Sequence, residues 1–293
     1  MAQVTASDGL SLYAEAHGSG TPVLFSCGLN TTHEHFRPQV APLVAEGFRV
    51  ILWDYRGHGE SDAPDDSGAY RVEQVLDDLE RVLEWGGGGE PAVLAGHSFG
   101  GLASLHCTLR RLAEIRALVL IASGPGFKKP EAQAGWVAQL EKTAGFLERK
   151  GTAALVEAAQ VVGRRPEQPA ARAAAEAAAA QSAVGLAHFS REVATRIGPV
   201  IDELEAIEVP ALVIVGEKDQ AYLRAGDVMA ARLPRAEKFE VAAAGHVVNL
   251  DETEVFNREL IRYLRGFGGP AQRGTPLNIR VGGTPPGERN SLG

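Results

Sequence analysis

The chain has 293 residues, of which 45% are hydrophobic and 23% are charged, and its formal net charge is −8. This composition is typical of a globular protein that buries a large core without disulfides, and the acidic balance argues against nucleic acid or an anionic membrane as a partner. The first residues lack the features of a signal peptide, no apolar run approaches the roughly 20 residues that cross a bilayer, and Cys27 and Cys107 are expected to be reduced thiols. These features predict a cytoplasmic protein.

The first part of the chain alternates short apolar runs with amphipathic segments, which is the pattern of a mostly parallel sheet with crossover helices. Between the apolar runs, hydrophobic residues recur at helical spacing. The predicted strands are 10–16 (placed at the edge of the sheet), 22–26, 48–53, 92–95 and 117–122, and the predicted helices are 36–46 and 72–85. The four glycines at 86–89 predict a flexible surface loop.

The composition changes after Ser123. Residues 125–199 contain no convincing strand and are rich in alanine, so they predict a helical insertion. Strands resume at 211–215 and 238–241, and a last helix covers 252–265. The sequence thus predicts a discontinuous α/β core (1–123 and 200–268), an inserted all-helical cap (124–199) and a polar, glycine- and proline-rich tail expected to be disordered (269–293).

The segment Gly96-His97-Ser98-Phe99-Gly100 lies between an apolar run and a segment that predicts a helix. A serine at a sharp turn from strand to helix is typical of a nucleophile elbow, in which small flanking residues let the two elements pack closely. A serine hydroxyl is a weak nucleophile unless a base lies within hydrogen-bonding reach and a carboxylate orients that base. Asp219 and His246 each follow a predicted strand, where open α/β sheets bind their ligands, and they give the chain order Ser, Asp, His.

Together these segments resemble the α/β-hydrolase superfamily, and in particular its small capped members, over residues 8–265. The residues that carry the resemblance are Gly28, Asp54-Tyr55-Arg56-Gly57-His58-Gly59-Glu60-Ser61-Asp62, the elbow, Gly216-Glu217-Lys218-Asp219 and Gly245-His246. The resemblance implies Ser98 as nucleophile, His246 as base and acid, and Asp219 as the orienting carboxylate. It also implies an oxyanion hole made by the backbone N–H groups of Leu29 and Phe99, with the inserted helices as a lid. The family usually has His-Gly where this chain has Cys27-Gly28, so the packing of this loop must differ.

Several other residues are candidates for the site. A substrate pocket is predicted to involve Asn30, Trp136, Phe146, Phe189 and Val247, although Asn30 could simply shape a turn and the bulky residues could pack the cap onto the core. His33 and His35 flank Glu34 but lack the second ligand pair of a metal site, so we expect them at the surface or at the rim of the pocket. We expect a packing role for His97. Cys27 is a candidate thiol nucleophile, but it lacks a base of its own. No metal and no cofactor is predicted.

The resemblance implies a cofactor-independent serine hydrolase that cleaves an ester, lactone or thioester through an acyl-enzyme on Ser98, similar to carboxylesterases and small lactonases, including enol-lactonases. The predicted partner is a small-molecule acyl substrate. Serine at the elbow argues against the related dehalogenases and epoxide hydrolases, which have aspartate there. Hydrolysis of a carbon–carbon bond, peracid formation and acyl transfer use the same three residues and stay open, as does a non-catalytic receptor for small molecules. The sequence indicates no oligomeric state.

Overall fold

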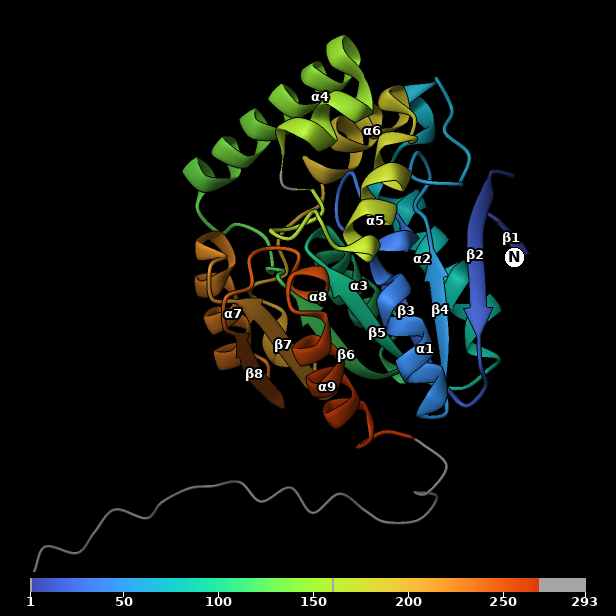
Figure 1. Cartoon of the computed structure of the whole chain (residues 1–293), viewed down its shortest axis with the longest axis vertical. Helices are drawn as coiled ribbons and strands as arrows, with labels where there is room; N and C mark the ends of the chain where they lie inside the picture. Colours follow the sequence, from blue (N-terminus) through green and yellow to red (C-terminus); the bar gives the residue numbers. More distant parts are fainter. Residues whose placement is uncertain (1, 160, 269–293) are drawn as a thin grey trace, which may run out of the picture.

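The computed structural model describes residues 2–159 and 161–268, which form one eight-stranded sheet with helices on both faces (Figure 1). The strand order is β1-β2-β4-β3-β5-β6-β7-β8. All pairs from β4 onward in this order are parallel, and β2 pairs antiparallel with both β1 and β4. The strands are β1 Ala2–Thr5, β2 Ser11–His17, β3 Thr21–Ser26, β4 Phe48–Trp53, β5 Ala92–His97, β6 Ile115–Ile121, β7 Ala211–Gly216 and β8 Ala236–Val241.

Two apolar layers cover the sheet, because successive side chains of a strand point to opposite faces. Leu24, Ile51 and Leu94 contribute to one layer, and their neighbours Val23 and Val50 contribute to the other. The first layer packs against α2 Val72–Gly87, α3 Phe99–Arg110 and α7 Gln220–Arg232; the second packs against α1 Arg37–Ala45, α8 Val248–Asp251 and α9 Thr253–Leu264. The predicted α/β architecture is therefore confirmed, and burial on both faces explains why the central strands are continuous apolar runs.

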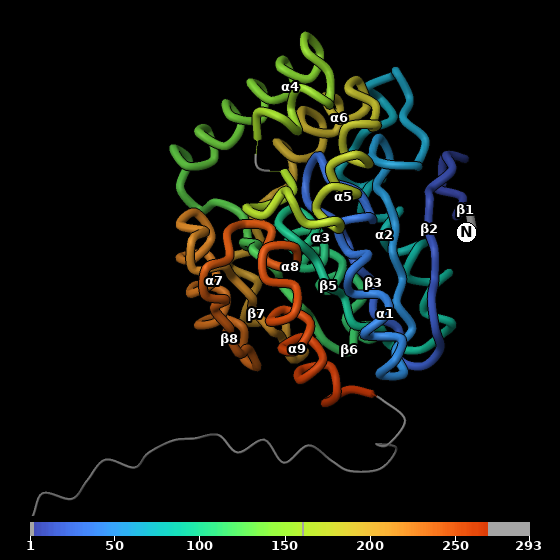
Figure 2. The backbone as a smooth tube through the Cα atoms, in the orientation of Figure 1, coloured from blue at the N-terminus to red at the C-terminus, as the bar shows by residue number. Residues whose placement is uncertain are grey.

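A helical insertion separates β6 from β7, as predicted. It contains α4 Pro130–Ala158, α5 Pro169–Ala179 and α6 Ala183–Phe189, and it lies at the end of the sheet where the parallel strands end (Figure 2). Pro169 occupies the first turn of α5, where its missing N–H costs nothing. The backbone N–H of Val200 donates to the carbonyl of Pro125 at 2.8 Å, so the two ends of the insertion meet. We call this insertion the cap.

Two local predictions were wrong. The segment placed at the edge of the sheet is β2, which lies one position inside because β1 pairs with it. The glycine run is not all loop, since α2 continues through Gly87 and only Gly88, with φ 63°, ends it. A Cβ on Gly86 would lie 2.6 Å from Cδ1 of Ile51, so this glycine lets the helix approach the sheet.

The predicted disordered tail lies outside the described residues. Within the described ranges, no helix combines the length and the hydropathy needed to cross a bilayer. Cys27 and Cys107 are both buried and unpaired with each other. The cytoplasmic location and the domain boundaries expected from the sequence stay predictions.

Candidate active site

Ser98 lies at the turn between β5 and α3. Its backbone has φ 53° and ψ −115°, a conformation that L-residues rarely adopt. A Cβ on Gly96 would lie 2.2 Å from the carbonyl oxygen of Gly100, and a Cβ on Gly100 would lie 2.1 Å from that of Ser26. Bare glycines on both sides of Ser98 are therefore required for this turn.

Asp219 and His246 are brought together at the same edge of the sheet. Asp219 is buried at the start of α7, directly after β7, and His246 lies in the loop after β8 with a half-exposed side chain. The Oδ2 atom of Asp219 lies 2.7 Å from Nδ1 of His246. A carboxylate on Nδ1 keeps a proton there and leaves Nε2 as the basic nitrogen of the neutral ring.

His97 supports the His246 loop and is more than a packing residue. Its ring lies 4.8 Å from the ring of His246, and its Nε2 donates to the His246 backbone carbonyl at 2.9 Å. Burial holds the pKa of His97 well below its usual range, so the ring stays neutral. On the other side of the loop, Asp251 accepts a hydrogen bond from the Gly245 N–H at 2.6 Å. The position of His246 is thus fixed by contacts from two elements.

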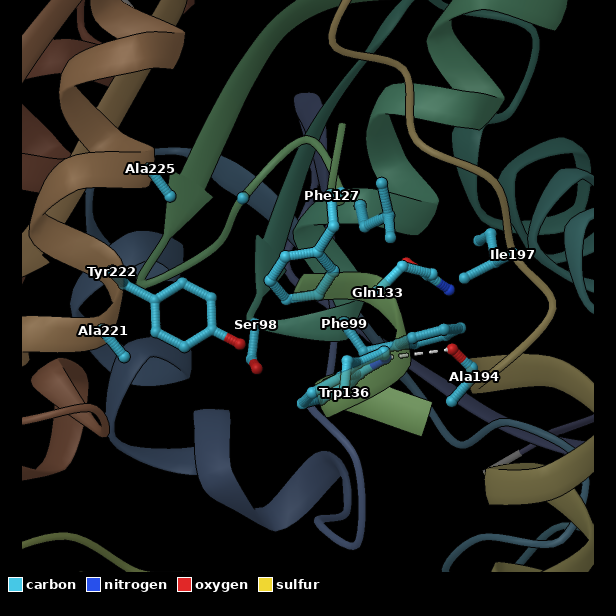
Figure 3. Close-up of a pocket in the computed structure, with 13 residues that line it drawn as sticks. Ser98, Phe99, Phe127, Gln133, Trp136, Ala194, Ile197, Ala221, Tyr222 and Ala225 are labelled. Carbon is cyan, nitrogen blue, oxygen red and sulfur yellow. Dashed lines mark hydrogen bonds between the residues drawn. The ribbon is translucent and has the colours of Figure 1, made fainter. Parts of the chain in front are cut away.

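Tyr222 is a site residue that sequence reasoning missed. Its ring packs against His246 with 4.7 Å between centroids and 31° between planes, and its hydroxyl points toward Ser98 (Figure 3). Burial raises the pKa of Tyr222, and the neighbouring Ser98 side chain only partly offsets this effect, so the phenol stays neutral. The available clue was its place in the first turn of the helix that Asp219 begins, three residues further on.

The expected oxyanion loop follows β3. Leu29 is half-buried, Phe99 is buried in the first turn of α3, and Asn30 has φ 62°. A Cβ on Gly28 would lie 2.8 Å from Nδ1 of His97, so the loop lies directly against that ring. Burial, together with the charge of Asp54, raises the pKa of Cys27 well above its usual value, which keeps this residue a thiol.

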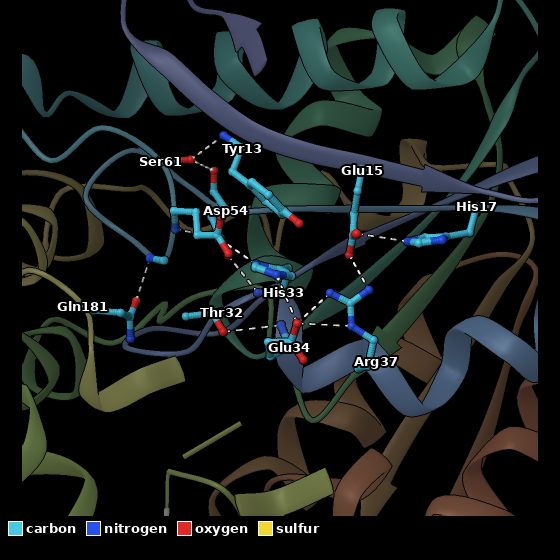
Figure 4. A network of polar contacts seen from close by, with 12 residues as sticks. Tyr13, Glu15, His17, Thr32, His33, Glu34, Arg37, Asp54, Ser61 and Gln181 are labelled. Atoms are coloured by element: carbon cyan, nitrogen blue, oxygen red, sulfur yellow. Dashed lines mark hydrogen bonds and ion pairs between the residues drawn. The ribbon is translucent and has the colours of Figure 1, made fainter. Parts of the chain in front are cut away.

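A buried polar network links the loop after β3 to the loop after β4 (Figure 4). Asp54 accepts hydrogen bonds from the backbone N–H of His33 at 2.7 Å and of Glu60 at 3.0 Å, and its Oδ2 lies 2.7 Å from Nδ1 of His33. Burial opposes charge on His33, but Asp54 outweighs it and raises the pKa of this histidine. Nε2 of His35 donates to the carbonyl of Val161 at 3.1 Å.

The expectation that His33 and His35 lie at the surface or at a pocket rim was wrong, because both are buried in this network. Their side chains secure the loop after β3 to the loop after β4 and to the cap. In the parts of the chain that the structure describes, no cluster of three potential metal ligands occurs.

A cavity of about 230 Å³ adjoins Ser98 between the core and the cap (Figure 3). Its lining comprises Ser98, Phe99, Leu102, Gly124, Gly126, Phe127, Gln133, Trp136, Ala194, Ile197, Ala221, Tyr222 and Ala225. Of the five residues predicted for the pocket, Trp136 is in this lining.

The other four lie outside the lining. Phe189 is buried against the ring of Phe99, 5.2 Å between centroids, and Val247 belongs to a small apolar cluster with Leu250 under α5. Phe146 is half-buried on α4, and the carbonyl of Asn30 accepts a hydrogen bond from the cap. Which aromatic residues of a helical cap face the site depends on how the cap is seated, and the sequence pattern does not determine that.

Comparisons with known proteins identify the family and support the fold. The sequence model of the family described as alpha/beta hydrolase fold matches residues 21–253. "Putative carbamate hydrolase RutD" of Variovorax paradoxus is 31% identical over 274 residues, which is 89% of this chain and 98% of that protein. The 3-oxoadipate enol-lactonase 1 of Acinetobacter baylyi is 28% identical over 90% of this chain and 95% of its own length.

Among solved structures, an esterase from Exiguobacterium antarcticum superposes with a TM-score of 0.77 at 26% identity, covering 90% of this chain and 98% of the esterase. The family match includes the elbow, Asp219 and His246. The chain belongs to the α/β-hydrolase family.

Proposed function

We propose that this α/β hydrolase is a serine esterase that forms an acyl-enzyme on Ser98. The observation that carries the proposal is the 2.7 Å contact between Asp219 and Nδ1 of His246, at the sheet edge where the strained turn presents Ser98. A binding protein has no need of an oriented histidine–carboxylate pair beside a serine held in an unfavourable backbone conformation.

In the first half of the reaction, Ser98 Oγ attacks the ester carbonyl while Nε2 of His246 accepts the hydroxyl proton. The carbonyl oxygen becomes an oxyanion, for which the N–H groups of Phe99 and Leu29 are the proposed donors. Each such donor is worth about 10²–10³ in rate. Collapse of the tetrahedral intermediate breaks the bond to the alcohol oxygen, which takes the proton from His246 and leaves as the alcohol.

In the second half, His246 accepts a proton from water as the water oxygen attacks the acyl carbonyl. The new intermediate breaks its bond to Ser98 Oγ, which regains a proton from His246, and the carboxylic acid departs. Asp219 stabilises the imidazolium in both halves and keeps its orientation. The names of the relatives, an esterase, an enol-lactonase and a carbamate hydrolase, support acyl chemistry of this kind.

The proposal is tested by covalent labelling and turnover. A fluorophosphonate probe should label Ser98, as located by peptide mass mapping, and p-nitrophenyl acetate and butyrate should be hydrolysed. Ser98→Ala should abolish both, whereas Ser67→Ala, at an exposed serine, should change neither. Lactones, thioesters and carbamates of similar size then rank the acyl classes. Absence of labelling at Ser98, or equal turnover by Ser98→Ala, would contradict the proposal.

A further inference from the structure

We infer that the cavity beside Ser98 admits only an uncharged, largely apolar part of the substrate, so that esters bearing a carboxylate in this position are rejected. The inference rests on the proposed function and specifies its substrate class. It follows from the character of the lining, from the bonding of the polar groups within it and from the charges around it.

The lining contains no aspartate, glutamate, lysine, arginine or histidine. Its hydroxyl groups belong to Ser98 and Tyr222, and the latter is neutral. A carboxylate moved from water into such a cavity loses its hydration and meets no cation. The free-energy cost of removing the carboxylate from water is much larger than the stabilisation from hydrogen bonds to two hydroxyl groups.

The two nitrogen-bearing side chains of the lining each donate a hydrogen bond within the cap. Nε1 of Trp136 donates to the carbonyl of Ala194 at 3.2 Å, and Nε2 of Gln133 donates to the carbonyl of Thr195 at 3.3 Å. Both bonds hold α4 against the segment that follows α6. A carboxylate could use the Trp136 donor only by breaking a bond within the cap. The second N–H of the Gln133 amide is a neutral donor, which cannot replace the hydration of a charge.

Two cations next to lining residues are already paired with carboxylates. Lys128, next to the lining residue Phe127, pairs with Asp202 at 2.6 Å. Arg196, next to Ile197, pairs with Glu192 at 2.7 Å. The formal net charge of −8 also disfavours the approach of an anion.

The volume limits the size of the group that enters. An apolar cavity of about 150 Å³ holds a benzene molecule. The volume of about 230 Å³ beside Ser98 therefore has room for a benzene-sized group with a few further carbon atoms. Phe127 and Trp136, with ring centroids 5.9 Å apart, provide aromatic surface on the cap side of the cavity.

The test compares esters that differ in charge but little in size. The acyl set is p-nitrophenyl heptanoate, the neutral 6-oxoheptanoate and the anionic hydrogen adipate, with spontaneous hydrolysis subtracted. A second pair, phenyl butyrate and 4-carboxyphenyl butyrate, places the charge on the alcohol side. One side of the ester, acyl or alcohol, occupies the cavity. When the carboxylate is on that side, we expect kcat/KM to be at least about 100-fold lower than for the matched neutral ester. A fall of less than about 30-fold on both sides overturns the inference.

A charge introduced into the lining gives an independent test. Gln133→Lys places an ammonium group in the cavity and keeps a donor for the Thr195 carbonyl. It should raise the kcat/KM ratio of the anionic to the neutral ester by about tenfold or more. Gln139→Lys, at an exposed position of the same helix, changes the net charge equally and should leave the ratio unchanged. Equal ratios in the two variants would overturn the inference.

Failure of this inference is distinguishable from failure of the proposed function. Labelling of Ser98 together with hydrolysis of the neutral esters supports the esterase, whatever the charge series shows. If that esterase hydrolyses the anionic esters equally well, the selectivity alone is wrong. If Ser98 is not labelled and no ester is hydrolysed, both statements fail.

Discussion

The side-chain amide of Gln181, at the end of the cap segment that contains α5, donates a hydrogen bond to the backbone carbonyl of Asn30 at 2.9 Å. The same side chain accepts one from the N–H of Gly59 at 3.1 Å and is almost fully buried (Figure 4). Because Leu29 directly precedes Asn30, this contact links the cap to the proposed oxyanion hole. If the proposed function holds, the cap contributes to the geometry of the reacting centre as well as covering it.

Replacing Gln181 should weaken catalysis more than binding. Gln181→Leu removes the bond to Asn30, and we expect kcat to fall about tenfold with little change in KM, a fraction of the loss of a complete oxyanion donor. Gln181→Glu can still accept from Gly59 but cannot donate to Asn30, so its kcat should fall similarly. Steady-state kinetics with p-nitrophenyl butyrate measure both, and Gln139→Leu on the exposed face of α4 is the control. A rise in KM at constant kcat would show that Gln181 shapes substrate binding instead.

The hydroxyl of Tyr222 should contribute to reactivity at Ser98. Tyr222→Phe keeps the ring against His246 but removes the donor, and we expect kcat/KM and the rate of fluorophosphonate labelling to fall about fivefold to tenfold. Tyr263→Phe is the matched control, since the hydroxyl of this distant buried tyrosine has no hydrogen-bond partner among the described residues. If both variants keep full activity, the Tyr222 hydroxyl has no part in the reaction.

The turn at Ser98 should not tolerate a side chain on Gly100. The 2.1 Å approach of a Cβ to the Ser26 carbonyl involves backbone on both sides, so neither partner can rotate away. We expect Gly100→Ala to lower the free energy of unfolding by about 3 kcal/mol or more, measured by urea denaturation. Gly135→Ala, in a helix with open space at the Cβ position, should instead raise it by about 0.5–1 kcal/mol. Equal stability of the two variants would refute this explanation of the elbow glycines.

Stability should decrease in mild acid because of buried neutral histidines. Burial lowers the pKa of His35 and of His58 to about 4, whereas both titrate near 6.5 when unfolded. Between these values the unfolded chain binds more protons, so the free energy of unfolding falls as the pH falls, by about 2 kcal/mol per residue at pH 5. His33, whose pKa is raised, acts in the opposite direction: its stabilisation is present below pH 6.5 and is lost as the pH rises through its folded pKa.

Urea denaturation at pH 7 and pH 5 measures this effect. In the unchanged chain, the free energy of unfolding should be lower at pH 5 than at pH 7. In His58→Gln this pH difference should be smaller by about 2 kcal/mol, because glutamine does not titrate. His35→Gln should give a similar reduction. The same pH difference in all three proteins would show that other groups determine the acid sensitivity.

The sequence predicted the central strands because parallel strands buried on both faces are continuous apolar runs. It missed β1, whose four residues alternate and are too short for a clear pattern. Gly86 was misassigned because its close approach to Ile51 becomes visible only when the partner strand is known. Local patterns thus predict elements well and contacts between distant elements poorly.

The same distinction applies to the candidate site. Ser98, Asp219 and His246 could be proposed from their positions after strands, which depend on the chain order alone. The contacts of His97 and Tyr222 with His246 depend on how a loop and a helix pack together. The burial of His33 depends on Asp54, 21 residues away and in another loop. Spacing along the chain contains no information on such pairs.

The hydrogen bond between Val200 and Pro125 holds the first and last residues of the cap next to each other, beside the sheet. A segment that leaves and re-enters a scaffold at adjacent positions can change in length and sequence without disturbing strand register. The selectivity of this enzyme can therefore evolve, or be engineered by grafting a different lid between these two positions, if the new lid keeps a donor for the Asn30 carbonyl.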